Sequence, residues 1–194
     1  MNITENESGR KPEEGPSFDM PPSHTSRLGV FGGTFDPVHS GHIELARRIL
    51  EEELVEEILF VPARHPPHKD AAEVASGEHR LAMLKLAIQD LPGASVCDIE
   101  LTREEGPSYT FDTLSTLNVA FRDASLYFIM GTDSLRELHT WHRAFELASN
   151  FHILVYPRPE APPPSYATLA NRFGVKQARR LQEAVIDLPE VEVS

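Results

Sequence analysis

The chain has 194 residues, of which 40% are hydrophobic, and this length suffices for one buried core. Its formal net charge of −12 argues against a general nucleic-acid-binding protein, which needs a basic surface to neutralise phosphates. The only cysteine, Cys97, cannot form an intramolecular disulfide, and no apolar run reaches the roughly 20 residues that span a bilayer. We therefore expect a cytoplasmic protein that does not enter a membrane.

Residues 1–26 form a segment of different composition from the rest of the chain. They are rich in Glu, Pro, Ser and Gly, and they contain neither a periodic apolar pattern nor the apolar stretch of a signal peptide. Such a segment cannot offset its ordering entropy by burial. We expect a disordered extension over residues 1–26 and a single folded domain over residues 27–194.

From Arg27 onward, short apolar runs alternate with segments of helical periodicity. Strands are expected at residues 28–31, 58–61, 96–101, 126–130, 151–156 and 185–188. Helices are expected at residues 43–50, 81–88, 114–121, 135–138, 143–147 and 175–184. This alternation favours a Rossmann-like α/β fold with helices on both faces of a mostly parallel sheet, because parallel strands need crossover connections. Ligands of such sheets bind beyond the carboxyl ends of the strands.

The segment between the first strand and the first helix runs from Gly32 to His42 and reads Gly-Gly-Thr-Phe-Asp-Pro-Val-His-Ser-Gly-His. Glycines at a strand end let the backbone approach a phosphate without a Cβ clash. Ser40 has the character of a helix N-cap, so His39 and His42 lie near the free N–H groups and the positive dipole end that attract phosphate. Each feature alone is ordinary, but together they favour a phosphate-binding site.

This segment resembles the His-x-Gly-His motif of a nucleotidyltransferase superfamily, and in its full length it is similar to that of bacterial nicotinate-mononucleotide adenylyltransferases. The resemblance extends over residues 27–194. It implies an enzyme of NAD biosynthesis that joins the adenylyl group of ATP to nicotinate mononucleotide, with deamido-NAD and pyrophosphate as products. Mg²⁺ would enter with ATP, and no metal ion would be bound by the protein alone.

The resemblance also implies roles for residues of the motif and of three later segments. The residues expected to be catalytic are His39, His42 and Lys69, the last within Pro-Pro-His-Lys. The residues expected to bind ATP are Gly32, Gly33, Phe35, Gly41, Gly131 and Asp133. The residues expected to line the mononucleotide pocket are Thr34, Tyr109, Thr110 and Trp141.

Structural interpretations of some of these residues stay open at this point. Lys69 is also consistent with a solvated surface lysine, and Ser108 with a plain helix N-cap. Asp133 could cap the next helix and still bind a ribose. Trp141 is the only tryptophan, and from the sequence alone such a residue is more often part of the core.

The implied reaction is direct in-line attack of the mononucleotide phosphate on the α-phosphorus of ATP, without a protein nucleophile. Catalysis then consists of positioning and of stabilising charge on phosphate oxygens. A pantetheine-phosphate adenylyltransferase or a cytidylyltransferase shares His-x-Gly-His but usually lacks Pro-Pro-His-Lys and the Ser-Tyr-Thr helix start. The sequence leaves open the preference between acid and amide forms of the mononucleotide, and it carries no indication of oligomeric state.

A nucleotide-binding protein without catalysis is the alternative from a different class. Family members continue into a Ser/Thr-rich turn whose arginine binds ATP phosphates, whereas this chain stops at Ser194. Because every upstream motif residue is present, we expect a shortened sequence rather than an evolved loss of activity. The chain as given is expected to bind ATP weakly.

Overall fold

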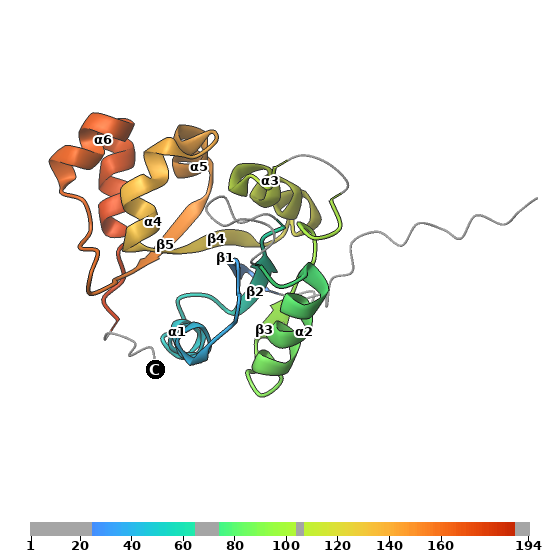
Figure 1. Ribbon diagram of the computed structural model, residues 1–194. Coiled ribbons are helices and arrows are strands. Elements are labelled where there is room, and N and C mark those ends of the chain that lie inside the picture. The colour runs from blue at the N-terminus through green and yellow to red at the C-terminus, as the bar shows by residue number, and fades with distance from the viewer. Residues whose placement is uncertain (1–24, 65–73, 104–106, 189–194) are drawn as a thin grey trace, which may run out of the picture.

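The computed structural model describes residues 25–64, 74–103 and 107–188 (Figure 1). The strands are β1 (Arg27–Gly33), β2 (Glu57–Pro62), β3 (Ala94–Val96), β4 (Ser125–Gly131) and β5 (His152–Tyr156). The helices are α1 (Ser40–Glu51), α2 (Gly77–Ile88), α3 (Thr110–Ala120), α4 (Thr132–Glu137), α5 (Ala144–Asn150) and α6 (Tyr166–Glu183), with a 3₁₀-helix η1 (Leu138–Thr140) before α5. Most of the expected N-terminal extension lies outside the described residues.

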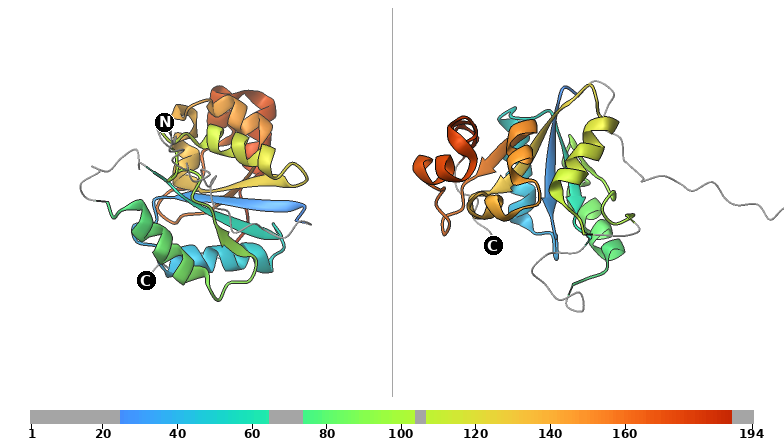
Figure 2. Two further views of the ribbon diagram at one scale, coloured as in Figure 1. Left: turned by 90° about the vertical axis from the view of Figure 1, so that its right-hand side faces the viewer. Right: turned by 90° about the horizontal axis from the view of Figure 1, so that it is seen from above.

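The strands form one five-stranded sheet in the order β3-β2-β1-β4-β5, and every pairing is parallel. Helices α1 and α2 cover one face, whereas α3 to α6 cover the other, as the left view of Figure 2 shows. This arrangement confirms the expected Rossmann-like α/β fold. The chain leaves β1 toward β2 but later returns to pair β4 with the opposite side of β1, which creates a switch point where ligands of such sheets bind.

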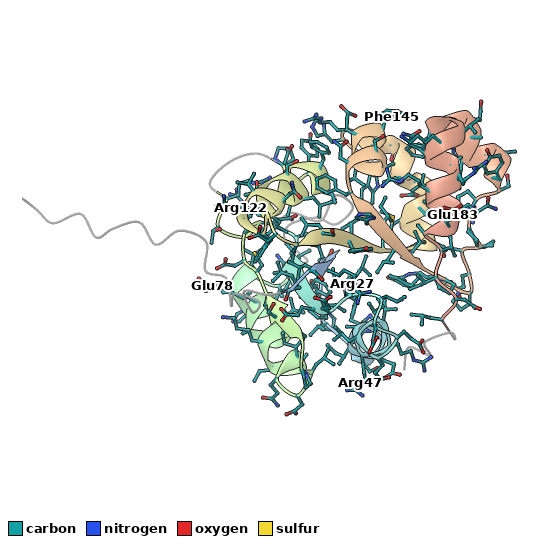
Figure 3. The ribbon with its side chains drawn as sticks, turned by 180° about the vertical axis from the view of Figure 1, so that it is seen from behind. Arg27, Arg47, Glu78, Arg122, Phe145 and Glu183 are labelled. Carbon is teal, nitrogen blue, oxygen red and sulfur yellow. The ribbon has the colours of Figure 1, made fainter. Side chains whose placement is uncertain are left out.

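Each face of the sheet has its own apolar core, because successive strand side chains point to opposite sides. On one face, Leu28 and Val30 of β1 pack in a cluster with Leu114 of α3. On the other, Phe31 packs in a cluster with Ile49 of α1. Charged side chains such as Arg47 on α1 and Glu183 on α6 lie on the outer surface (Figure 3). None of the helices in the described ranges has the length and apolar character needed to cross a bilayer.

The strand expected at residues 96–101 is wrong in position, since β3 ends at Val96 and the chain then turns. The turn is closed by a hydrogen bond from the Leu101 N–H to the Asp98 carbonyl at 2.8 Å. Ile99 lies in this turn, not in a strand, and its side chain is buried. Apolar residues in a tight turn imitate the alternation of a half-buried strand, which explains the error.

Two expectations near the carboxyl end also need correction. Helix α6 begins at Tyr166, where the Ser165 hydroxyl accepts from the Thr168 N–H at 3.2 Å, and it is kinked at Gly174, which has φ +81°. The sequence pattern detected only the part after the kink. The strand expected at residues 185–188 is a single parallel bridge between Val185 and Val155.

We predict that Leu59→Ala lowers the free energy of unfolding by about 2–5 kcal/mol, because it opens a cavity in a fully buried strand position. Leu59 is 0% exposed in β2, whereas Leu86 on α2 is 68% exposed. The same substitution at Leu86 is the matched control and should change stability by no more than about 0.5 kcal/mol. Urea denaturation measures both, and equal losses would contradict the assignment of the core.

Candidate active site

The loop after β1 is shaped by close packing under Gly33. A Cβ placed on Gly33 would lie 3.0 Å from the Phe35 ring, so a side chain at position 33 would press that ring aside. Phe35 itself is 2% exposed and has φ +50°, a backbone region that residues with side chains seldom occupy. The Gly33 carbonyl accepts from the Ala63 N–H at 2.8 Å, which ties this loop to the end of β2.

His39 and His42 stand together at the start of α1. Their ring centroids are 3.7 Å apart, and the His39 N–H donates to Nδ1 of His42 at 3.3 Å. His39 is the N-cap, which corrects the expectation that Ser40 begins the helix as its cap. Because Nδ1 of His42 accepts a hydrogen bond, the proton of its neutral ring is on Nε2, and that nitrogen is the free donor.

The surroundings of the two histidines keep both rings neutral at pH 7. Burial, then the neighbouring His39 and Arg158, lower the pKa of His42 to about 4. Partial desolvation and then Arg158 lower the pKa of His39. The Phe35 ring packs edge-on against His42, with 5.1 Å between centroids, and contributes to that burial. The pair therefore supplies hydrogen-bond donors near a helix N-terminus without adding charge of its own.

Asp133 lies beyond β4 and pairs with Arg158, which lies beyond β5. The Arg158 Nε is 3.2 Å from the Asp133 carboxylate, and both side chains are about half exposed. A Cβ on Gly131 would lie 2.8 Å from that Nε and closer still to the Asp133 carboxylate, so a side chain at position 131 would displace the pair. The Arg158 N–H donates to the Thr132 hydroxyl at 2.9 Å, and its guanidinium donates to the Tyr156 hydroxyl at 2.7 Å.

Arg158 is a site residue that the sequence analysis missed. It carries the positive charge that acts on both histidines. The feature that could have identified it is its position, directly after the last strand of a parallel sheet, where ligand-binding residues gather.

A second group of side chains surrounds the start of α3. Tyr109 is the N-cap of α3, and its ring stacks on His142 with 4.1 Å between centroids. Arg143 lies over the Phe111 ring, 3.8 Å from its centroid. Thus the loop that begins at Trp141 lies beside Tyr109 and Thr110, as a shared pocket requires, and His142 and Arg143 are neighbours that the sequence analysis did not name.

Phe128 of β4 connects the two groups. Its ring is 6.1 Å from the Trp141 ring, in an edge-to-face arrangement, and 3.5 Å from the position of a Cβ on Gly32. Trp141 is half-buried against the core and therefore has both a packed and an exposed part. The residues that the structure gathers at this end of the sheet are Gly32, Gly33, Thr34, Phe35, His39, Gly41, His42, Tyr109, Thr110, Gly131, Asp133 and Trp141; Lys69 lies outside the described residues.

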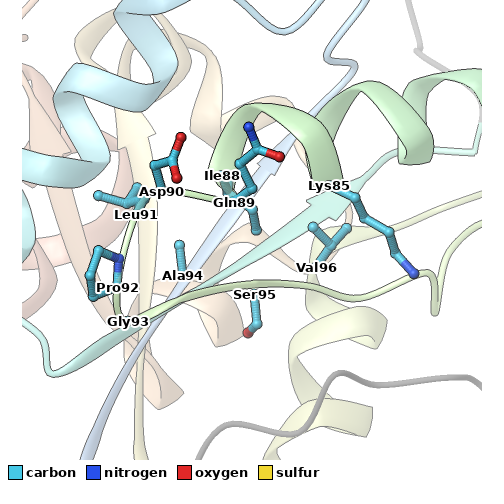
Figure 4. A pocket seen from close by; sticks show the side chains of 10 residues that line it. All are labelled: Lys85, Ile88, Gln89, Asp90, Leu91, Pro92, Gly93, Ala94, Ser95 and Val96. Carbon is cyan, nitrogen blue, oxygen red and sulfur yellow. The ribbon is translucent and has the colours of Figure 1, made fainter.

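Groups of metal ligands and pockets are two other kinds of candidate site. Within residues 25–64, 74–103 and 107–188, no three His, Cys, Asp or Glu side chains are grouped so as to hold a metal ion. A pocket of about 630 Å³ lies at the carboxyl end of α2, lined by Lys85 and residues 88–96 (Figure 4). It contains none of the expected site residues.

The depressed pKa of His42 predicts a pH dependence of stability. Because the folded pKa, about 4, lies below the ordinary 6.5, the unfolded chain binds this proton more readily between these values. His42 therefore leaves the free energy of unfolding at its full value above pH 6.5 and lowers it as the pH falls toward 4. The free energy of unfolding of the wild type should decrease more between pH 7 and pH 4.5 than that of His42→Asn, measured by urea denaturation. Parallel pH profiles would show that His42 titrates normally.

Comparisons with known proteins identify the family of the chain. The model of the cytidylyltransferase-like family matches residues 30–189. A probable nicotinate-nucleotide adenylyltransferase of Rhodopirellula baltica is 38% identical over 173 residues, which cover 89% of this chain and 80% of that protein. The nicotinate-nucleotide adenylyltransferase of Bacillus subtilis is 41% identical over 133 residues, which cover 69% of this chain and 70% of that protein.

Solved structures give the same fold. The nicotinic acid mononucleotide adenylyltransferase of Plasmodium falciparum, complexed with NaAD, superimposes with a TM-score of 0.66 at 17% identity. The match covers 86% of this chain and 77% of that one. By its family model and its sequence relatives, the chain belongs to the cytidylyltransferase-like family and, within it, to the nicotinate-nucleotide adenylyltransferases.

Proposed function

We propose that this enzyme transfers the adenylyl group of ATP to nicotinate mononucleotide through the histidine pair at the start of α1. The observation that carries the proposal is the neutral His42 ring, whose Nε2–H remains free to donate while Nδ1 is occupied by the His39 N–H. Donors that are already oriented stabilise developing charge on a phosphate oxygen without reorganising during the reaction. The sequence relatives named above support the same reaction.

In this reaction the 5′-phosphate of the mononucleotide attacks the α-phosphorus of ATP, and the bond to the leaving pyrophosphate breaks in line. Both phosphates are already ionised, so no side chain has to act as nucleophile or base. His39 and His42 donate to phosphate oxygens at the N-terminus of α1, where the helix dipole favours anions. Gly32 and Gly41 allow the phosphates to approach the backbone, whereas Gly33 leaves room for the Phe35 ring.

The adenosine side of the site is formed by Asp133, Gly131 and Arg158. A carboxylate accepts hydrogen bonds from ribose hydroxyls, and Asp133 points from the end of β4 where such contacts occur in dinucleotide folds. Its ion pair with Arg158 is half exposed, and pairs of this kind stabilise by only about 0–1 kcal/mol. The carboxylate can therefore accept a ribose hydroxyl without a large loss from the ion pair.

The mononucleotide side is formed by Thr34, Tyr109, Thr110 and Trp141. The first turn of α3 offers free N–H groups beside Tyr109 and Thr110, which favour an anionic group of the substrate. Trp141 offers an aromatic face for the pyridine ring, and its contact with Phe128 fixes the orientation of that face.

Mg²⁺ belongs to this proposal as an ion bound mainly by ATP. Such an ion neutralises charge on the phosphates, and it usually keeps several waters and one or two carboxylates as ligands. The polar groups of the described site residues are chiefly donors for anions, so ATP itself would supply most of the ligands of this ion. Lys69 is proposed to assist at the phosphates. A cytoplasmic location is also proposed, on the basis of the single free Cys97.

His42→Ala should lower kcat by about 10²–10³-fold, the effect of losing one oriented donor to a transition-state oxygen. His152→Ala is the matched control: His152 is exposed at the amino end of β5, whereas the site lies at the carboxyl ends of the strands, so the kcat of this variant should equal that of the wild type. Steady-state assays of pyrophosphate release measure both. If His42→Ala keeps more than half of the wild-type kcat, His42 has no catalytic role.

Trp141→Ala should raise the KM for nicotinate mononucleotide about tenfold or more and leave the KM for ATP nearly unchanged. Stacking of a base on an aromatic ring contributes about 1–3 kcal/mol, and only the pyridine would lose that contact. The same assay, with each substrate varied in turn, measures the two constants. A lower melting temperature with both KM values unaltered would identify Trp141 as a core residue only.

A further inference from the structure

Arg80 is a buried arginine whose guanidinium group contacts three separate segments of backbone. It lies in α2 and is 2% exposed. Its Nε donates to the Ala75 carbonyl at 3.0 Å, and one terminal nitrogen donates to the carbonyls of Thr34 and Ala63, both at 2.8 Å. Burial lowers the pKa of Arg80, while Asp36 raises it, and an arginine keeps its charge in either case.

These contacts converge on the loop between β1 and α1. Thr34 lies in that loop, Ala63 directly follows β2, and Ala75 precedes α2. Two more hydrogen bonds connect the same segments: the Asp36 carboxylate accepts from the Ala75 N–H at 3.2 Å, and the Gly33 carbonyl accepts from the Ala63 N–H. Arg80 is therefore at the centre of the contacts that hold residues 33–36 in place.

The Thr34 carbonyl belongs to the peptide group that enters Phe35, so its orientation is coupled to the backbone angle of Phe35. That angle, φ +50°, is disfavoured and persists only where the surroundings hold it. The Phe35 ring then lies 5.1 Å from the His42 ring and 5.7 Å from Phe31. A continuous series of contacts thus leads from Arg80 through Thr34 and Phe35 to His42.

We propose that Arg80 is a positioning residue for His42: by holding the Thr34 peptide it fixes Phe35, and the Phe35 ring fixes the imidazole. The proposal rests on the phosphate role of His42 proposed above. Arg80 itself is buried, and its guanidinium is directed at backbone carbonyls. The guanidinium fork matters because a single lysine ammonium cannot reproduce its planar array of donors toward three carbonyls.

Arg180 provides a matched control within the same chain. It lies in α6 and donates to the carbonyls of Ser149 and Phe151 at 2.6 and 3.2 Å. These carbonyls precede β5, at the amino end of the strands, whereas the histidines lie at the carboxyl end. Arg180→Lys therefore removes the same kind of contact without disturbing the loop after β1.

The test compares Arg80→Lys with Arg180→Lys in melting temperature, kcat, both KM values and the NMR titration of His42 in the free enzyme. We expect Arg80→Lys to lower kcat at least tenfold with both KM values within threefold of wild type, and to move the His42 midpoint upward from about 4. Arg180→Lys should keep kcat within twofold and leave the midpoint unchanged. A folded Arg80→Lys enzyme with normal kcat and midpoint, or equal kcat losses in both variants, overturns the proposal.

Phe35→Leu gives an independent test. It decides the proposal even in the case that Arg80→Lys does not fold. It keeps a buried apolar side chain and removes the ring beside His42. We expect the same decrease of kcat and the same upward shift of the midpoint, and in the double variant the two losses should overlap rather than multiply. An unchanged midpoint in Phe35→Leu overturns the proposal. The midpoint is measured without substrate, so it is informative even if His42→Ala retains turnover and the catalytic role of His42 fails.

Discussion

The parallel pairing of β1 with β2 on one side and β4 on the other is the constraint on which the site depends. It aligns the carboxyl ends of three strands, with Gly33 opposite Pro62 and Phe31 opposite Ile129. Loops that leave these ends in different directions open a crevice between them. The histidines after β1, the aspartate after β4 and the arginine after β5 therefore meet, although His39 and Arg158 are far apart in the chain.

The sequence predicts the features that depend on local pattern and misses those that depend on distant contacts. The first strand and the motif up to His42 are recognisable because apolar runs and helix-start residues are adjacent in the chain. Arg80 has no such local context, since the Thr34 carbonyl that it binds is 46 positions away. The error at residues 96–101 has the opposite origin: Ile99 is apolar because a turn buries it, and no local pattern separates that case from a strand.

An acidic protein that binds two anionic substrates has to limit the electrostatic repulsion between itself and those substrates at the binding site. The proposed site combines uncharged donors, namely two neutral histidines and the helix N-termini of α1 and α3, with the cations Arg158 and Arg143. Neutral donors avoid the desolvation cost that a buried charge carries before the ligand arrives. The net charge of −12 is then spread over the remaining surface, where solvent and salt screen it.

The environment of Cys97 has a practical consequence for work on this enzyme. Its side chain is 0% exposed, and burial raises the pKa of the thiol to about 12. Since only the thiolate reacts with electrophiles, the folded enzyme presents essentially no reactive sulfur at neutral pH. A cysteine introduced at an exposed position such as Val119, which is 76% exposed, would therefore be the single attachment point for a fluorophore or spin label. Distances and motions could be measured from that point without first removing the native thiol.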